Sequence, residues 1–528
     1  MRLLAPLLLP LALCAPTVPS PSRSLPELSV SQWSAIQSGI FDRISTLTSW
    51  SWSKAEEVVH DIEADLGIPT TLHPGSEGDD ESKTIWEQLK DDPNSFSRLV
   101  KVLEFEGKAY KYLDDKDLSI TFFAPNNDAL KPPEHHHDHD HDGDHDHDEV
   151  EGDAVLAELA NSPSLAVLHS TLEREPTLLL KDKDSDSDSD SDDDKEDDDD
   201  KKKKRRKEII RKIAGYILQY HGLTEAYTAR ELATNSTFPT ALKAHDGSYG
   251  GLHRRIKVEK SLVPPSLKLN GYAKVLVSDR KASNGYFHTL NHPLLPPPSI
   301  LDELFLFPDF FSTLTSAVQQ VHKSWALDWS YDRNKSKSEG KPHFHGAPLA
   351  TAFTPSNTAF HLLPPKLKFY LFSPYGRWAL TKLLAYHYVP ETLLLTEFFY
   401  SEHKHHHHGP EHSDFGVAGS DDDPSFHKEF DVHTGLHNAT IKVEIDKTKF
   451  LPVEGAVKIT LKANGQIADA IDIPARNGAW HVLNKVLVPP HHHHGHHDHD
   501  EHRAAVHVVS EDCWDSWEEW LPAWADTA

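Results

Sequence analysis

Histidine is the residue type in this chain best suited to chemistry, and its positions are clustered. The 528-residue chain has 39 His, and 21 of them fall in three tracts in which His repeats or alternates with acidic residues. Imidazole nitrogen binds Zn, Cu and Ni, and the interleaved carboxylates widen that choice. Because such tracts have no fixed geometry, we expect loose binding of Zn, Cu or Ni and no required cofactor. The candidate metal ligands are His135, His136, His137, His139, His141, His145, His147, His405, His406, His407, His408, His491, His492, His493, His494, His496 and His497.

Two further interpretations of the tracts stay open. The first is a solvated, disordered spacer without a ligand. The second is a response to pH, because histidine gains a positive charge near pH 6.5. Protonation of the tracts would cancel much of the formal charge of −28 that the chain carries at pH 7.

Catalytic chemistry has little support in the remaining residues. The motifs GxSxG, HExxH, the P-loop and CxxC do not occur, so the sequence predicts no enzyme. Tyr220-His221 and Tyr386-His387 each end a stretch of apolar, helical text, without a nucleophile at a suggestive position. Because buried polar groups need partners, we interpret each pair as a packed tyrosine and a hydrogen-bonded, half-buried histidine.

Composition and termini point to the secretory pathway. The strong acidic charge opposes binding of nucleic acid. The first 15 residues read as a signal peptide with an apolar run too short to span a bilayer, and no later run is long enough for a transmembrane helix. Cleavage after Ala15 would leave Cys513 as the one cysteine, available for an intermolecular contact.

An internal repeat decides the domain organisation. Three elements occur twice in the same order, which predicts two copies of one domain. The first pair would form a strand that ends at a proline and enters a helix capped by Asn126 or Asn127 in the first copy. The last pair begins with Asn-Gly, a hairpin-turn dipeptide. The pairs are TFFAPNNDAL (121–130) with TAFTPSNTAF (351–360), ILQYHGL (217–223) with LLAYHYV (383–389), and NGYFHTLNHPLLPP (284–297) with NGAWHVLNKVLVPP (477–490).

These three elements together resemble the boxes of the FAS1 (fasciclin) domain family, whose central box carries a Tyr-His pair. The resemblance implies an α+β fold, with two tandem β-sandwich-like wedges that each carry helices and long disordered His/Asp-rich inserts. It also implies a secreted or cell-surface protein for adhesion or matrix interaction, with cell-surface or matrix proteins or glycans as partners. The vacuole or another secretory lumen is the alternative compartment. The residues that the family motif makes structural are Pro125, Tyr220, His221, His288, Pro355, Tyr386, His387 and His481.

The resulting domain plan has five parts. It consists of a signal peptide (1–15), a helical leader and linker (16–82), domain 1 (83–298, with an insert at about 134–205), domain 2 (299–490, with an insert at about 403–430), and a His-rich segment with a Trp-rich acidic tail (491–528).

Smaller signals concern modification and contact. N-x-S/T sequons at Asn235, Asn334 and Asn438 predict glycosylation in a secreted protein. The run KKKKRRK at 201–207 follows 13 carboxylates in 182–200, so mutual neutralisation is simpler than nucleic-acid binding. The four tryptophans of the tail would share one helical face, which could pack on the protein itself or on a partner. A function as a metal-binding or pH-responsive protein that uses the domains as a scaffold is the alternative to adhesion.

Overall fold

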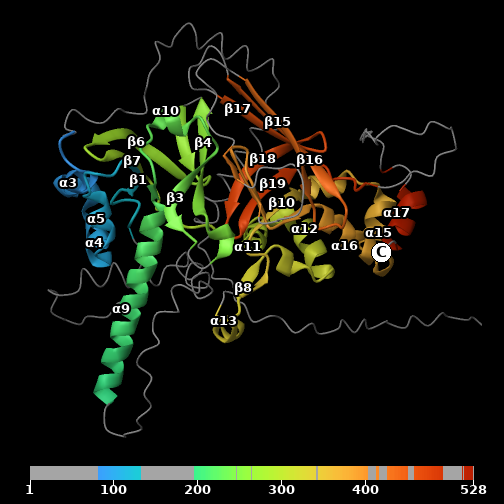
Figure 1. Cartoon of the computed structure of the whole chain (residues 1–528), viewed down its shortest axis with the longest axis horizontal. Helices are drawn as coiled ribbons and strands as arrows, with labels where there is room; N and C mark the ends of the chain where they lie inside the picture. The colour runs from blue at the N-terminus through green and yellow to red at the C-terminus, as the bar shows by residue number, and fades with distance from the viewer. Residues whose placement is uncertain are drawn as a thin grey trace, which may run out of the picture.

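The computed structural model contains two domains side by side, and the domain 2 end carries a C-terminal helix (Figure 1). The predicted signal peptide, the leader up to residue 80, the candidate metal ligands and Cys513 lie outside the described residues. The residues described are 81–131, 195–244, 247–262, 265–340, 343–401, 412–414, 425–449, 457–490, 514 and 517–526.

Domain 1 begins with helices that local capping signals define. Thr84 caps the first helix in a capping box with Glu87, and Pro93 opens the second, which ends at Gly107 with a φ of 84°. The buried faces of these helices form a cluster with the inner strands. The helices of domain 1 are α3 (Ile85–Asp91), α4 (Pro93–Glu106), α5 (Ala109–Leu113), α9 (Lys195–Tyr220), α10 (Ala229–Leu232) and the 3₁₀ turn η1 (Ser248–Gly251).

The strands of domain 1 close into a barrel in chain order, and β1 and β7 are its parallel pair. The sheet strands predicted at the last repeat box are confirmed, because β6 and β7 form a hairpin that pairs Ala282 with Gly285. The strands are β1 (Ile120–Pro125), β2 (Gly222–Leu223), β3 (Thr237–Lys243), β4 (His253–Leu262), β5 (Pro265–Leu269), β6 (Ala273–Ala282) and β7 (Gly285–Leu290).

Domain 2 repeats the arrangement with more helices. Ser299 caps its first helix, and the apolar faces of the helices join the strands in one large core cluster. The helices are α11 (Ile300–Leu306), α12 (Pro308–Gln320), η2 (Ser324–Ala326), α13 (Arg333–Glu339), α14 (Asn357–His361), α15 (Pro365–Leu371), η3 (Pro374–Gly376), α16 (Arg377–Tyr386) and the tail helix α17 (Trp517–Asp526).

The main sheet of domain 2 has the order β11-β10-β19-β18-β17-β16-β15, with β10 parallel to β19. Small sheets β12-β13-β14 and β8-β9 flank it. The strands are β8 (Trp329–Tyr331), β9 (Phe344–Gly346), β10 (Ala350–Pro355), β11 (Tyr388–Pro390), β12 (Thr392–Leu394), β13 (Phe398–Ser401), β14 (His412–Asp414), β15 (Ser425–His433), β16 (Thr440–Lys449), β17 (Val457–Ala463), β18 (Gln466–Ala475) and β19 (Gly478–Leu483).

The two copies match residue by residue at the parallel pair. Ile120 pairs with Gly285 in domain 1, and Ala350 pairs with Gly478 in domain 2. A Cβ on either glycine would lie 1.8 or 1.7 Å from the carbonyl oxygen of its partner. The glycine of each Asn-Gly dipeptide is therefore required by the close approach of the strand, besides any role in the turn.

Three expectations need correction. The insert predicted at about 134–205 ends earlier, because α9 is already helical from Lys195. The insert predicted at about 403–430 includes strand β14 and the start of β15. Asn127 does not cap a following helix: its amide group bonds backward to α4, where Oδ1 accepts from the Arg98 N–H at 2.9 Å. Asn126, the other candidate, accepts from the Ala129 N–H at 2.8 Å, but residues 127–130 form a turn in place of a helix.

The tail helix packs on the protein itself. Trp517 and Trp520 are buried in the core cluster of domain 2, and Trp517 lies 5.3 Å from the ring of Tyr370. Lys382 on α16 donates to the carbonyl of Trp524 at 2.9 Å. Domain 2 therefore covers the tryptophan side of α17, which a partner could otherwise have contacted. No helix in the described part of the chain is both long and apolar enough to cross a membrane.

Candidate functional site

The Tyr-His pair is a structural joint in both domains. Tyr220 and Tyr386 end α9 and α16, and the hydroxyl of Tyr386 donates to the Thr440 carbonyl at 3.0 Å while accepting from the Asn464 amide at 2.7 Å. Tyr220 makes the same two bonds, to the Arg255 carbonyl and from Asn270. Each tyrosine therefore ties a helix end to the opposite side of its sheet.

The histidine that follows joins the same helix to the segment after the closing strand. In His387, Nε2 accepts from the Leu487 N–H at 2.9 Å, so the proton is on Nδ1, which donates to the Leu383 carbonyl at 2.8 Å. His221 bonds in the same way, and burial lowers the pKa of both rings to about 4. Both rings are held neutral and neither nitrogen is open to a substrate.

His288 and His481 in the closing strands form a second joint. Nδ1 of His481 accepts from the Asp472 N–H at 3.1 Å, and Nε2 donates to the Leu394 carbonyl at 3.1 Å. Asp472 has a φ of 56°, so the histidine secures a left-handed kink in β18. His288 holds Asp279 in the same manner. The geometry agrees with a structural interpretation of all four predicted histidines and gives none of them a catalytic arrangement.

A buried polar cluster joins the two domains, and no motif in the sequence indicated it. Its ion pair joins Arg255 of domain 1 to Glu397 of domain 2 at 3.3 Å, and the Asp472 carboxylate of the cluster is fully buried. Ser236 Oγ lies 2.9 Å from Glu397 Oε2 and also contacts Asp472 Oδ2. We call this set, completed by Thr237, Lys257 and Thr396, the seam cluster.

The buried charges of the seam cluster make the loss of one charged partner energetically unfavourable. Burial raises the pKa of Glu397, and the nearby Asp472 carboxylate raises it further, whereas the Arg255 guanidinium opposes this shift. Burial also raises the pKa of Asp472. Breaking such a pair by removal of one partner leaves an uncompensated buried charge, which costs about 3–5 kcal/mol.

Apolar contacts complete this seam. Tyr249 of domain 1 is 1% exposed and clusters with Leu349, Leu393 and Leu395 of domain 2. The Tyr249 N–H donates to the Pro348 carbonyl at 3.0 Å. The two domains therefore share a common interior, unlike domains that are joined only by a flexible linker.

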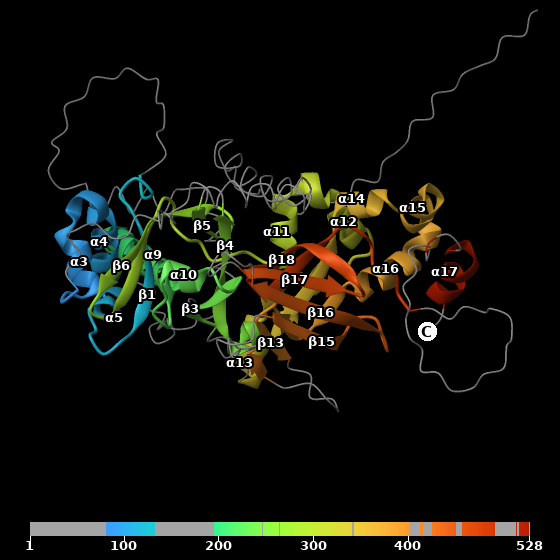
Figure 2. The same cartoon turned by 90° about the horizontal axis from the view of Figure 1, so that it is seen from above.

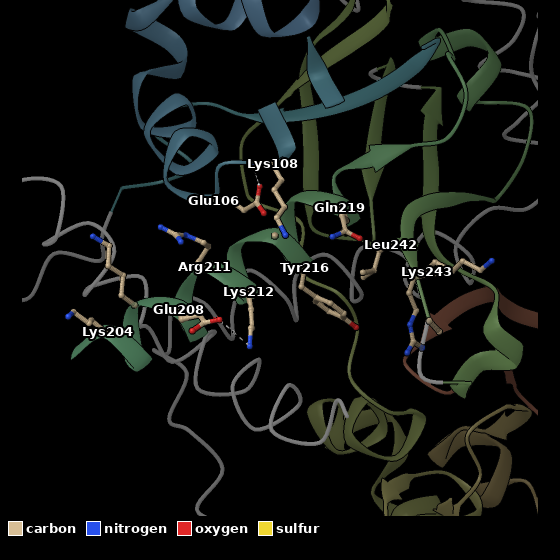
Figure 3. A pocket seen from close by; sticks show the side chains of 14 residues that line it. Glu106, Lys108, Lys204, Glu208, Arg211, Lys212, Tyr216, Gln219, Leu242 and Lys243 are labelled. Atoms are coloured by element: carbon tan, nitrogen blue, oxygen red, sulfur yellow. Dashed lines mark hydrogen bonds and ion pairs between the residues drawn. The ribbon is translucent and has the colours of Figure 1, made fainter. Parts of the chain in front are cut away.

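A basic groove runs along α9 in domain 1 (Figure 3). It has a volume of about 650 Å³, and seven cationic and two acidic side chains line it. The cations come from α9, from the segment between α4 and α5, and from strands β3 and β4. They are Lys108, Lys204, Lys207, Arg211, Lys212, Lys243 and Arg254.

The lining of the groove has a net positive charge, because its two acidic side chains are outnumbered by the cations. Glu106 accepts backbone bonds from Lys108 and Ala109, and Glu208 lies 3.6 Å from Lys212. Arg211 lies over the Phe105 ring, 5.5 Å from its centroid. The result is a cationic groove on a protein with a formal charge of −28, where the field would concentrate small or flexible anions.

The sequence contained a signal for this groove that composition alone obscured. Lys204, Lys207 and Arg211 are spaced three and four residues apart, which is one face of a helix. Neutralisation of the run at 201–207 by the acidic residues before it stays a prediction. The continuation of α9 to Tyr220 places Lys204, Lys207 and Arg211 in the groove wall.

The predicted sequons lie in different surroundings. Asn334 and Asn438 are exposed, and Asn438 is in the turn between β15 and β16 as expected. Asn235 is half-buried beside the seam cluster, where its amide oxygen accepts from Lys447 at 2.7 Å. Glycosylation at all three stays a prediction. Within the described ranges, no group of three or more His, Cys, Asp or Glu side chains could hold a metal ion.

Comparison with family models identifies the domain type. The model of the fasciclin domain family matches residues 199–296 and 309–489, together more than half of the chain. A curated relative, aurofusarin biosynthesis cluster protein S of Gibberella zeae, is 28% identical over 245 residues, which are 45% of this chain and 54% of that protein. The chain thus spans about half the length of this relative. A solved FAS1 domain pair from the insect cell adhesion molecule fasciclin I shares 14% identity with a TM-score of 0.26, covering 75% of this chain and 98% of that one.

Proposed function

Because the chain belongs to the fasciclin domain family, we propose that it is a non-catalytic binding protein of the adhesion or matrix type, secreted or held at the cell surface. A vacuolar or other secretory lumen is the alternative compartment. The bonds of His221, His387, His288 and His481 support the absence of catalysis, since the fold itself uses every one of their ring nitrogens.

The observation that carries the binding role is the basic groove. Its seven cations suit the carboxylate or sulfate groups of an acidic glycan, because cationic side chains form strong charge-assisted hydrogen bonds with such oxygens. Tyr216 is the one aromatic side chain in its lining. A groove for single-stranded nucleic acid would need several aromatic rings for the bases to stack on, so a glycan fits better.

A direct binding assay tests this function. The full chain is passed over immobilised heparin and polygalacturonate, with neutral dextran as the reference surface. We expect binding to both acidic polymers that weakens steeply between 50 and 200 mM salt, as counterion release requires. Reversal of three groove charges, Lys204→Glu, Lys207→Glu and Lys243→Glu, should lower the affinity by at least about tenfold.

A matched control separates the groove from net charge. Lys101, Lys116 and Lys274 are exposed lysines of domain 1 outside the groove, and their reversal to Glu changes the net charge equally. Equal loss of binding in both variants would refute the groove as the site. No binding of the unaltered chain to either acidic polymer would refute the glycan function.

The histidine tracts support metal binding as a second candidate function. The specific observation is that 21 of 39 His are concentrated in three tracts. Calorimetric titration with Zn²⁺ and Cu²⁺, beside a variant without the three tracts, tests it. If glycan binding persists in that variant without metal, the tracts are accessory; if it disappears, metal handling is central.

The Gibberella zeae relative favours a third candidate within the same non-catalytic class. Its name assigns that protein to a biosynthesis cluster, so a binding role beside biosynthetic enzymes is open to this chain. Comparison of secreted metabolites with and without the protein, by mass spectrometry, tests it; unchanged metabolites would reject it.

A further inference from the structure

Domain 2 exposes large apolar side chains at the end far from domain 1. Leu362, Phe369, Tyr375 and Trp378 are 63%, 81%, 87% and 69% exposed. They lie within 17 residues, at the end of α14, on α15, in η3 and at the start of α16. These helices lie with α17 at the end of domain 2 that is remote from the barrel of domain 1 (Figures 1 and 2). We call this set the aromatic face.

The core of domain 2 does not need these side chains. Leu367 and Leu371 of α15 and Leu380 and Leu383 of α16 point into the core and are at most 1% exposed. The outer face of a surface helix is ordinarily polar. A group of exposed large apolar side chains on such helices instead marks a place of contact.

The segment that carries the aromatic face has basic but no acidic residues of its own. The chain has no Asp or Glu between Glu339 and Glu391, although 82 acidic residues in 528 would place about eight in a stretch of that length. The same stretch carries Lys366, Lys368 and Arg377 beside the aromatic side chains. On α17, Glu518 lies 3.4 Å from Lys366, and Glu519 and Asp526 belong to the same helix.

We propose that the aromatic face is a docking surface for a lipid bilayer with anionic headgroups. Trp and Tyr rings are favoured at the level of the headgroups, because one part of the ring is apolar and the other polar. Basic side chains next to them are attracted to anionic lipid, and each adds roughly fivefold to the partition constant. A protein of net charge −28 would be repelled by such a membrane, so a stretch free of acidic residues also sets its orientation.

A second copy of the chain suits this face less well. In a symmetric dimer the same patch meets itself, so Lys368 and Arg377 of one copy would approach those of the other. Like charges brought together across an interface are unfavourable. An anionic surface supplies the complementary charge that a second copy lacks.

Vesicle flotation with the full chain tests the proposal. Vesicles contain either phosphatidylcholine alone or phosphatidylcholine with 30% phosphatidylserine. We expect the chain to float with the anionic vesicles, and less so at high salt. Replacing Phe369, Tyr375 and Trp378 with Ser should reduce the bound fraction at least tenfold, without unfolding because all three are exposed. Lys368→Gln with Arg377→Gln should reduce the partition constant about 25-fold, from roughly fivefold for each charge.

Two control variants make the result decisive. Trp325→Ser with Ile467→Ser removes large side chains that are 53% and 56% exposed elsewhere, and it should keep vesicle binding. The triple groove variant of domain 1 should keep it as well, which separates this surface from the proposed glycan site. Absence of flotation, or flotation that the aromatic substitutions leave unchanged, overturns the proposal. A chain that is dimeric by light scattering and becomes monomeric with these substitutions, without vesicle binding, also overturns it in favour of a second copy.

Discussion

The neutral state of His387 makes a quantitative prediction about acid stability. Burial lowers the pKa of this ring from 6.5 to about 4. Between these two values the unfolded chain binds a proton that the folded chain does not bind, so the folded state loses stability as the pH falls below 6.5. For one such histidine, the loss relative to pH 7.5 is about 2 kcal/mol at pH 5 and about 3 kcal/mol at pH 4.

The perturbation is His387→Gln, which replaces the ring with a neutral amide. At pH 7.5 the variant should be less stable by about 1–3 kcal/mol, because the Leu487 N–H and the Leu383 carbonyl lose well-placed partners. On acidification to pH 5, however, the variant should lose about 2 kcal/mol less than the unaltered chain. The two stability curves therefore approach one another as the pH falls.

Urea unfolding at pH 7.5, 6, 5 and 4, followed by tryptophan fluorescence and circular dichroism, measures this difference. Only the difference between variants is interpreted, because the raised pKa values of Glu303, Glu397 and Asp472 act in the opposite direction in both chains. Replacement of the exposed His437 with Gln is the control and should leave the pH dependence unchanged. Parallel curves for His387→Gln and the unaltered chain would refute a buried, neutral His387.

Other predictions follow from single close contacts. Gly478→Ala should abolish soluble expression, because the new Cβ would lie 1.7 Å from the Ala350 carbonyl oxygen at a φ of 140°; near-normal yield would contradict this. Arg255→Met should cost about 3–5 kcal/mol by leaving Glu397 buried without its cation, measured by thermal unfolding, and a loss under about 1 kcal/mol would refute the pairing. Among the sequons, Asn235 should stay unglycosylated in a secretory host, because its amide bonds across the seam; peptide mapping that finds a glycan there would disprove the packing.

The fold was predictable because the repeated elements are local. Apolar and polar residues alternate in IKVEKSLV (256–263) and IKVEID (441–446), as in half-buried strands, and these segments lie in β4 and β16. The Tyr-His pair and the Asn-Gly dipeptide marked a helix end and a hairpin, which depend on neighbouring residues. The two capping candidates show the limit, since Asn126 bonds locally to the Ala129 N–H, whereas Asn127 bonds to Arg98 of α4, 29 residues earlier.

The seam cluster could not be predicted in this way. Ser236 contacts Thr396 and Asp472, which are 160 and 236 residues away in the chain. None of these residues belongs to a motif, and each is a polar type that is ordinarily exposed. Only the packing of one domain on the other brings them together, and no periodicity in one segment encodes that packing.

The seam also determines how the basic groove and the aromatic face can act together. The groove lies along α9 in domain 1, and the aromatic face lies on α15 and α16 at the remote end of domain 2 (Figure 1). Arg254 of the groove wall donates to the Arg476 carbonyl of domain 2, so the seam also fixes one wall of the groove. Two sites held at a fixed distance can bind two surfaces at once only when the surfaces are that distance apart. A flexible linker between the domains would allow a range of distances.

The fixed distance between the two sites can be tested by measuring whether the chain holds one surface to another. Anionic vesicles should be retained on a heparin-coated surface only when the chain is present, because one end binds each surface. Loosening the seam with Arg255→Met should change the retention of vesicles more than it changes binding to heparin or to vesicles alone. In the unaltered chain and in the Arg255→Met variant, vesicle retention could instead equal what the two separate affinities multiply to. That result would show that the domains act independently. The seam cluster would then contribute to stability without setting the distance between the sites.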